Sequence, residues 1–217
     1  MTCPLCLNKV IKKYHQDKLR DYWQCQKCLL VFIKPECHLS SQQEKSIYDL
    51  HQNNPDDKGY RRFLNKLLVP LAKKLTPDAQ GLDFGSGPGP AIFVIMNEQG
   101  VSVENYDVFY ANKPELLKKA YDFITCTEVV EHLYHPHEVF SQLSAMLKSG
   151  GLLGIMTKRV INQEKFDNWH YKNDPTHVCF YSDETFEFIA EYWGFYLEVI
   201  SSDTVILQKP LLSQASF

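Results

Sequence analysis

Short apolar runs alternate with amphipathic stretches over most of the chain beyond residue 60. Six apolar runs have the length of strands: 79–84, 101–107, 121–126, 152–157, 195–200 and 204–208. Four stretches can form helices: 60–74, 91–96, 137–148 and 182–192. Strands that alternate with helices predict an α/β fold with a parallel sheet. The last two strands have no helix between them, which predicts a closing antiparallel hairpin.

The pattern in 37–78 is helical, with one interruption. Ser41 followed by Glu44 resembles a capping box. The run 53–57, with two Asn, a Pro and two Asp, breaks the helix. Pro70 is expected to kink or end the second segment. We therefore predict a helical linker over 37–78, followed by the main domain over 79–217.

The first 36 residues follow a different pattern, with short strands expected at 9–11, 21–24 and 29–32. Two Cys-x-x-Cys pairs, Cys3 with Cys6 and Cys25 with Cys28, are separated by 18 residues. This is zinc-ribbon spacing, in which each tight turn directs two thiolates toward one ion. A domain of roughly 36 residues has little core, so bound zinc supplies much of its folding energy. We predict a structural zinc ribbon over 1–36.

A glycine-rich turn follows the first strand of the main domain, in Asp83-Phe84-Gly85-Ser86-Gly87-Pro88-Gly89. Strand, glycine turn and helix form the crevice in which backbone approaches a nucleotide-like ligand closely. The spacing is Asp-x-Gly-x-Gly-x-Gly and not Gly-x-Gly-x-x-Gly. It resembles the class I S-adenosylmethionine-dependent methyltransferases. A plain turn between packed elements is the alternative interpretation.

The resemblance implies a Rossmann-like sheet over 79–217 that binds S-adenosylmethionine. Asp107 ends the second strand, where an acid accepts hydrogen bonds from ribose hydroxyls, and we expect it to be exposed and replaceable. The cofactor contacts expected are Asp83, Phe84, Gly85, Ser86, Gly87, Gly89, Asp107 and Cys126. For Cys126, a small buried apolar side chain is the alternative. Only 108–120 separates the second strand from the next, so the family's third strand is expected to be missing or shortened. Helices before the first core strand often cover the cofactor in this family, which gives 37–78 a role as a lid.

A second candidate site follows the strand 121–126. Glu128, Glu131 and His132 fall on one side of a turn or helix start, and His177 stands in the long loop up to residue 182. The Glu-x-x-Glu-His run with a later His resembles the metal site of small-RNA 3′-terminal 2′-O-methyltransferases, and ubiquinone-biosynthesis O-methyltransferases carry the same run. The resemblance implies a second divalent ion, magnesium, manganese or zinc, held by these four residues. His132 acting as a general base is the alternative.

Composition and charge limit the classes of binding partner that we expect. The formal net charge is −3, which gives no general attraction to nucleic acid. Residues 1–36 carry seven Lys/Arg and three Asp/Glu, a local charge of +4 that permits a nucleic-acid face, although a solvated surface is favoured. No apolar run approaches membrane-spanning length. Paired cysteines without a secretory leader indicate a cytoplasmic protein.

Together these features predict an S-adenosylmethionine-dependent methyltransferase with an N-terminal zinc ribbon. The Glu-x-x-Glu-His resemblance favours O-methyl transfer to a small molecule or an RNA. One alternative is C- or N-methylation of a sugar or another metabolite. The other is a regulatory protein that binds the cofactor without turnover. The sequence does not identify the methyl acceptor.

Overall fold

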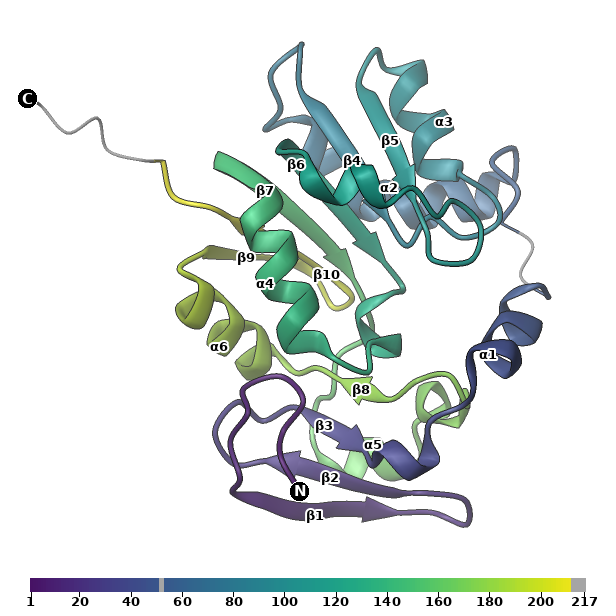
Figure 1. The fold of residues 1–217 in the computed structure, drawn as a ribbon, viewed down its shortest axis with the longest axis vertical. Coiled ribbons are helices and arrows are strands. Elements are labelled where there is room, and N and C mark those ends of the chain that lie inside the picture. Colours follow the sequence, from purple (N-terminus) through teal and green to yellow (C-terminus); the bar gives the residue numbers. More distant parts are fainter. Residues whose placement is uncertain (51–52, 212–217) are drawn as a thin grey trace, which may run out of the picture.

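The computed structural model describes residues 1–50 and 53–211. Its main feature is a sheet of six strands in the order β5-β4-β6-β7-β10-β9 (Figure 1). The first four strands in that order are parallel to one another. The strand β10 is antiparallel to β7, and β9 is antiparallel to β10. The strands of this sheet are β4 (Gln80–Phe84), β5 (Ser102–Tyr106), β6 (Tyr121–Thr127), β7 (Leu147–Met156), β9 (Tyr196–Ser201) and β10 (Thr204–Gln208).

Helices cover both faces of the main sheet. One face carries α2 (Lys58–Ala72) and α3 (Ala91–Glu98), which bury Leu67 and Ile95 against strand residues such as Phe123. The other carries α4 (Pro136–Met146) and α6 (Asp183–Trp193). These two helices lie together in Figure 1. The sheet is therefore the middle layer of an α/β/α arrangement, as the alternation of strands and helices predicts.

A second, antiparallel sheet has the order β1-β2-β3-β8. Its first three strands, β1 (Ile11–Gln16), β2 (Asp21–Cys25) and β3 (Val31–Ile33), come from the expected ribbon. The fourth, β8 (Cys179–Phe180), comes from the long loop of the main domain and pairs with β3. The buried cysteines of the ribbon belong to the same apolar cluster as the α4 and α6 face of the main sheet. The two sheets thus share one core.

Shorter elements connect these parts. They are α1 (Ser41–Tyr48), α5 (Gln163–Asp167) and the 3₁₀ turns η1 (Pro35–Cys37), η2 (Pro114–Lys118), η3 (Val130–His132) and η4 (His170–Asn173). Ser40, one residue before the expected cap, forms the capping box of α1 with Gln43. The helix α2 continues through Pro70 to Ala72. The first ribbon strand begins at Ile11, two residues later than the pattern indicates.

The region after β5 confirms the shortened third strand. Within residues 1–50 and 53–211, β5 is the edge of the main sheet, and an isolated bridge between Asp107 and Ala111 is followed by η2. The helix predicted over 137–148 is shorter in the structure. The helix ends at Met146 and β7 starts at the next residue, with Gly150 at a φ of +76° where the register with β6 shifts. Glycine there permits an irregular turn within a strand.

None of the helices in residues 1–50 and 53–211 combines the length and the apolar character that crossing a bilayer requires.

Candidate functional site

The glycine turn lies at the carboxyl end of β4 and needs glycine for two reasons. Gly85 and Gly87 have φ angles of +78° and +65°, which side chains other than glycine rarely adopt. A Cβ on Gly85 would stand 2.4 Å from a methyl group of Val129, and one on Gly89 would stand 2.1 Å from the carbonyl oxygen of Asn53. Glycine therefore permits both the shape of the turn and its close packing.

Asp107 follows β5 and braces this turn. One carboxylate oxygen accepts a hydrogen bond from the Gly87 N–H at 2.9 Å. The other accepts from the N–H groups of Phe109 and Tyr110, at 2.8 and 3.1 Å. Asp107 is 8% exposed, so the expectation of an exposed acid is wrong. Its carboxylate joins the glycine turn to the loop after β5.

Asp83, the last acid of β4, is buried below the glycine turn at 3% exposure. The hydroxyl of Thr125 on β6 donates a hydrogen bond to it at 2.8 Å. Burial raises the pKa of Asp83 to about 7, and the Thr125 bond offsets part of that rise. A cation placed above Asp83 would favour its ionised form.

A cavity of about 1050 Å³ opens at the carboxyl ends of the parallel strands, where open α/β sheets bind ligands. Seven of the expected cofactor contacts line it: Asp83, Phe84, Gly85, Ser86, Gly87, Gly89 and Asp107. Cys126 does not, because it is fully buried in the core, while the next residue of β6, Thr127, reaches the cavity. Side chains alternate along a strand, so only one of these two neighbours can face the ligand.

Aromatic residues complete the cavity wall, and the sequence interpretation did not assign most of them to it. Tyr48 on α1 and Tyr60 on α2 line it from 37–78, and Phe109 and Tyr110 line it from the loop after β5. The Tyr110 hydroxyl donates to Asp49 at 2.7 Å, which ties that loop to the end of α1. The signal in the sequence for Phe109 and Tyr110 was their position directly after Asp107.

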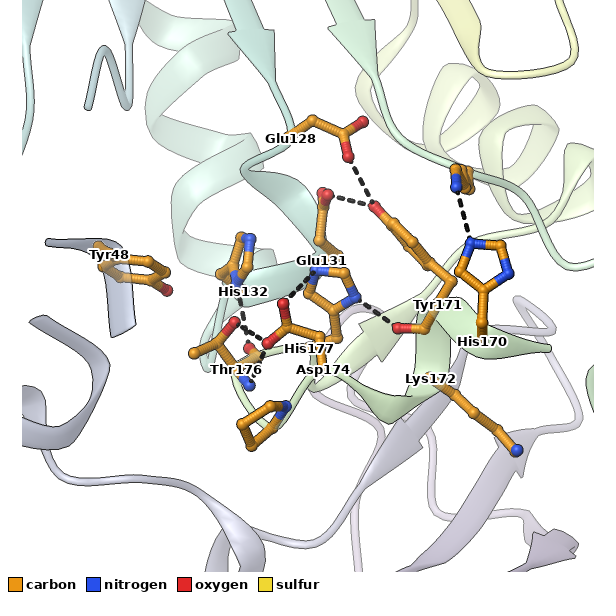
Figure 2. Close-up of polar contacts among 12 residues, drawn as sticks. Tyr48, Glu128, Glu131, His132, His170, Tyr171, Lys172, Asp174, Thr176 and His177 are labelled. Carbon is orange, nitrogen blue, oxygen red and sulfur yellow. Dashed lines mark hydrogen bonds and ion pairs between the residues drawn. The ribbon is translucent and has the colours of Figure 1, made fainter. Parts of the chain in front are cut away.

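The second candidate site adjoins the same cavity, which His132 and His177 line while Glu131 is fully buried, and it gathers three of its four expected residues. Ligand atoms of Glu131, His132 and His177 all lie within 4.8 Å of one another. Glu128 is outside this group. Figure 2 shows the Tyr171 hydroxyl between the two glutamates; it donates to Glu131 and lies 3.4 Å from Glu128.

Backbone carbonyls set the orientation of both imidazoles. Nδ1 of His132 lies 3.1 Å from the carbonyl oxygen of Thr176, and Nδ1 of His177 lies 2.7 Å from that of Tyr171. A carbonyl only accepts hydrogen bonds, so each Nδ1 carries a proton, and in the neutral form of each ring Nε2 then carries the lone pair. The ring centroids are 4.7 Å apart. This arrangement of oriented imidazoles is typical of metal-ligating histidines.

The carboxyl groups of Glu128 and Glu131 lie in surroundings that disfavour their ionised forms. Glu131 is fully buried, and its Oε2 has no hydrogen-bond partner among the described residues. Burial, reinforced by the nearby Glu128, raises the pKa of Glu131 to about 8. Burial also raises the pKa of Glu128 to about 7. Glu128 has a φ of +52°, a rare value for this residue type that is often found at functional sites.

This donor set fits a divalent cation. A buried carboxylate oxygen with no hydrogen-bond partner among the described residues, together with two imidazoles whose Nδ1 atoms face carbonyls, matches the oxygen and nitrogen ligands of magnesium, manganese or zinc. Burial lowers the pKa of His177, which favours the neutral, ligating form. A cation would also favour the ionised form of Glu131, offsetting the cost of burying that charge.

The four ribbon cysteines form a second group that fits a metal. Their sulfur atoms lie within 4.8 Å of one another, at 3.5 Å for Cys3 and Cys28 and 3.4 Å for Cys6 and Cys25. These separations are too long for disulfides and near the roughly 3.8 Å that a tetrahedral zinc site with ~2.3 Å bonds implies. Burial raises the pKa of Cys6 to about 12, so a cation is needed to hold it as a thiolate.

The two cysteine turns have the same backbone geometry. Leu7 and Leu29, each the residue after the second cysteine of a pair, have φ angles of +60° and +56°. The N–H of each donates to the carbonyl of the first cysteine of its pair, in both cases at 3.1 Å. Repetition of this strained turn in both halves is the geometry expected of paired metal-binding knuckles.

A family model described as a methyltransferase domain matches residues 57–199. A ubiquinone biosynthesis O-methyltransferase of Pseudomonas savastanoi pv. phaseolicola is 34% identical over 77 residues, 36% of this chain and 33% of that protein. The protein of the same name from Colwellia psychrerythraea is 33% identical over 85 residues, 39% of this chain and 34% of its own length. The matched segment thus spans about a third of these curated relatives.

Solved structures share the fold at low sequence identity. An S-adenosylmethionine-dependent methyltransferase from Archaeoglobus fulgidus aligns with a TM-score of 0.50 at 19% identity, covering 70% of this chain and all of that one. A 1,6-didemethyltoxoflavin-N1-methyltransferase from Burkholderia thailandensis, solved with S-adenosylhomocysteine, aligns with a TM-score of 0.52 at 12% identity, covering 92% of this chain and 99% of its own.

These findings support an enzyme over a binding protein without turnover, because both the family model and the named relatives describe methyltransferases. The family model covers the glycine turn, the cavity wall from α2 to β7 and the second candidate site. The chain therefore belongs to the methyltransferase-domain family and has the α/β Rossmann-like fold of S-adenosylmethionine-dependent methyltransferases.

Proposed function

We propose that this enzyme transfers a methyl group to a hydroxyl oxygen, assisted by a divalent cation held by Glu131, His132 and His177. The observation that carries the proposal is the buried Glu131 carboxylate, with one oxygen lacking a partner in the described chain, beside two oriented imidazoles. The same cavity contains the glycine turn. Similarity to relatives named O-methyltransferases also favours oxygen as the acceptor.

The cofactor half of the cavity is built for a ligand with positive charge. When bound, S-adenosylmethionine supplies an electrophilic methyl group on a cationic sulfur. Asp83, whose burial disfavours its own charge, gains from a cationic ligand above it. Asp107 holds the glycine turn in shape and lines the cavity, where its oxygens can also accept hydrogen bonds from ribose.

The acceptor half combines the cation site with a nearby base. When bound, a divalent cation lowers the pKa of an acceptor hydroxyl and orients its oxygen. Glu128 lines the cavity and has a pKa raised to about 7, which suits a residue that accepts the hydroxyl proton near neutral pH. The strained backbone of Glu128 holds its carboxylate at the end of β6. Glu128 thus takes the role of proton acceptor instead of metal ligand.

The remaining regions take supporting roles in this proposal. Zinc at Cys3, Cys6, Cys25 and Cys28 stabilises residues 1–36, because a closed shell of four thiolates leaves no position for a substrate. Residues 37–78 cover the cavity, since Tyr48 and Tyr60 form part of its wall. The acceptor is a small molecule or an RNA hydroxyl; binding of nucleic acid through the basic ribbon is not favoured. Cytoplasmic location stays a prediction.

Labelling identifies the acceptor and tests the choice of oxygen. The purified chain is incubated with S-adenosylmethionine carrying a labelled methyl group and with separate small-molecule and RNA fractions of a cell extract. We expect the label in a methyl ether, lost with Glu131→Gln while cofactor affinity stays near that of the wild type. Label found on nitrogen or carbon would overturn the assignment to oxygen and favour the alternative, C- or N-methylation of a sugar or another metabolite.

A further inference from the structure

We propose that Arg20 of the ribbon hairpin is a positioning residue for methyl transfer, because it fixes the loop that orients His132 and His177. This inference rests on the proposed function of that site. Arg20 lies before β2, outside the segment that the methyltransferase family model matches. The terminal nitrogens of its side chain, however, contact the end of η4 and the loop between η4 and β8.

The guanidinium of Arg20 binds four backbone carbonyls of that loop. Nη1 donates to the carbonyl of His177 at 3.0 Å and faces that of Pro175 at 3.5 Å. Nη2 donates to the carbonyls of Asp174, at 3.1 Å, and of Lys172. A planar group with five N–H donors can satisfy several carbonyls at once, which an ammonium on a flexible stem does less well.

Arg20 is itself held in place by its own hairpin. Its Nε donates to the hydroxyl of Tyr22 at 3.2 Å, and that hydroxyl donates to the Asp17 carboxylate at 2.8 Å. Asp17 also accepts the backbone N–H of Arg20 at 2.8 Å. Tyr22 is fully buried. The guanidinium therefore presents fixed donors to the loop, and little side-chain freedom remains to be lost on forming these bonds.

The segment held by Arg20 and the adjoining residue of η4 supply the two carbonyls that orient the imidazoles. Thr176, whose carbonyl faces His132, lies between two residues whose carbonyls face Arg20, Pro175 and His177. The carbonyl of Tyr171 faces Nδ1 of His177 and precedes the carbonyl of Lys172, also held by Arg20. Rotation of any of these peptide groups would turn an imidazole away from its present direction.

Two further links connect the same loop to β3 and to η3. Val178 accepts a hydrogen bond from the N–H of Ile33 on β3 at 3.0 Å. Its own N–H donates to the carbonyl of Glu131 at 2.8 Å. The strand β8 that follows has only two residues, so regular pairing contributes little to holding the loop. Among the described residues of the ribbon, Arg20 donates the most hydrogen bonds to this loop and to the end of η4. Its loss should therefore alter the site without removing any catalytic side chain.

The test compares Arg20→Ala and Arg20→Lys with a control, Lys13→Ala. Lys13 lies on the same hairpin, and among the described residues its ammonium contacts Asp21 and Gln16. We expect Arg20→Ala to lower kcat roughly 10- to 100-fold, the range that small displacements of a positioned group produce. Zinc content and cofactor affinity should stay near wild type. Amide hydrogen exchange should accelerate at Thr176, His177 and Val178, and Lys13→Ala should change none of these.

The lysine variant separates positioning from folding. Arg20→Lys keeps the charge but not the planar fork, so we expect an intermediate kcat and intermediate exchange in a folded, zinc-containing protein. Wild-type kcat together with wild-type exchange in either Arg20 variant would overturn the proposal. Failure of the proposed function is distinguishable: a fully active His177→Ala variant would remove the role of the imidazole, while the exchange at 176–178 would still report whether Arg20 holds the loop.

Discussion

Replacement of Asp107 by Ala tests whether this acid braces the cofactor site. The change removes the acceptor of three backbone hydrogen bonds, at 2.8, 2.9 and 3.1 Å. Hydrogen bonds to a charged group contribute about 1.5–3 kcal/mol each, so three at the low end total about 4.5 kcal/mol. Water entering from the adjoining cavity can satisfy part of the loss. We therefore expect the free energy of unfolding to fall by about 2–3 kcal/mol.

For a chain of this length, 1 kcal/mol shifts Tm by about 2–4 °C, which gives a decrease of about 4–12 °C. Thermal unfolding followed by circular dichroism without cofactor measures this directly. Titration calorimetry with S-adenosylhomocysteine should show weaker binding, because the Gly87 N–H loses the acceptor that holds the turn in shape. Both effects come from the same carboxylate.

The control is Glu104→Ala on β5. Glu104 pairs with Lys119 at 2.9 Å on the protein surface, with a side chain 39% exposed. Exposed ion pairs contribute about 0–1 kcal/mol, so this variant should lose only a few degrees at most. Equal Tm values for Asp107→Ala and Glu104→Ala would refute the reasoning and restore the view of Asp107 as a replaceable acid.

Three further predictions follow from the structure. Purified protein should contain about one zinc per chain. The Cys25→Ser variant should lose both zinc and methyl transfer, because β2 is part of the hairpin whose Arg20 holds the catalytic loop. Transfer at the wild-type rate in zinc-free protein would contradict this. Gly85→Ala should abolish the thermal shift caused by cofactor, since its Cβ would meet Val129 at 2.4 Å; an unchanged shift would show that the turn can adapt. The stability of the cofactor-free protein should fall as the pH rises from about 4 to about 7. The pKa of Asp83 rises from 3.8 to about 7 on folding, so in that range the folded state holds a proton that the unfolded state has released. Asp83→Asn should reduce this slope in denaturant titrations, and an identical slope would exclude Asp83 as its source.

Local rules were sufficient to predict the glycine turn that lines one part of the cavity. Glycine at positions 85 and 87 is needed by backbone with positive φ, and such positions are visible in a sequence because few other residues tolerate them. The spacing of the four cysteines predicted their convergence, because it reflects two identical tight turns. The assignment of Cys126 to the cofactor site was wrong because side chains alternate along a strand. Thr127 is on the cavity side of β6, so its neighbour Cys126 faces the core.

The acceptor half depended on contacts between residues far apart in the sequence. Arg20 and His177 are separated by 157 positions, and nothing in a short hairpin indicates which carbonyls its arginine will bind. The strand β8, with two residues, is too short to show a period. The role of Tyr171 was also out of reach, because an aromatic residue in a loop packs more often than it donates to a buried carboxylate.

The central claim is that Glu131, His132 and His177 hold a cation that methyl transfer requires. The most direct measurement records Mn²⁺ binding, by the loss of the free-ion paramagnetic signal, and the rate of transfer to the identified acceptor in one titration. The chelator used beforehand must be mild enough to leave zinc in the ribbon. We predict that occupancy and rate rise together to about one Mn²⁺ per chain, and that Glu131→Gln loses both. Full transfer with no Mn²⁺ bound, rising with pH through a pKa near 6.5, would contradict the claim and leave His132 as a general base.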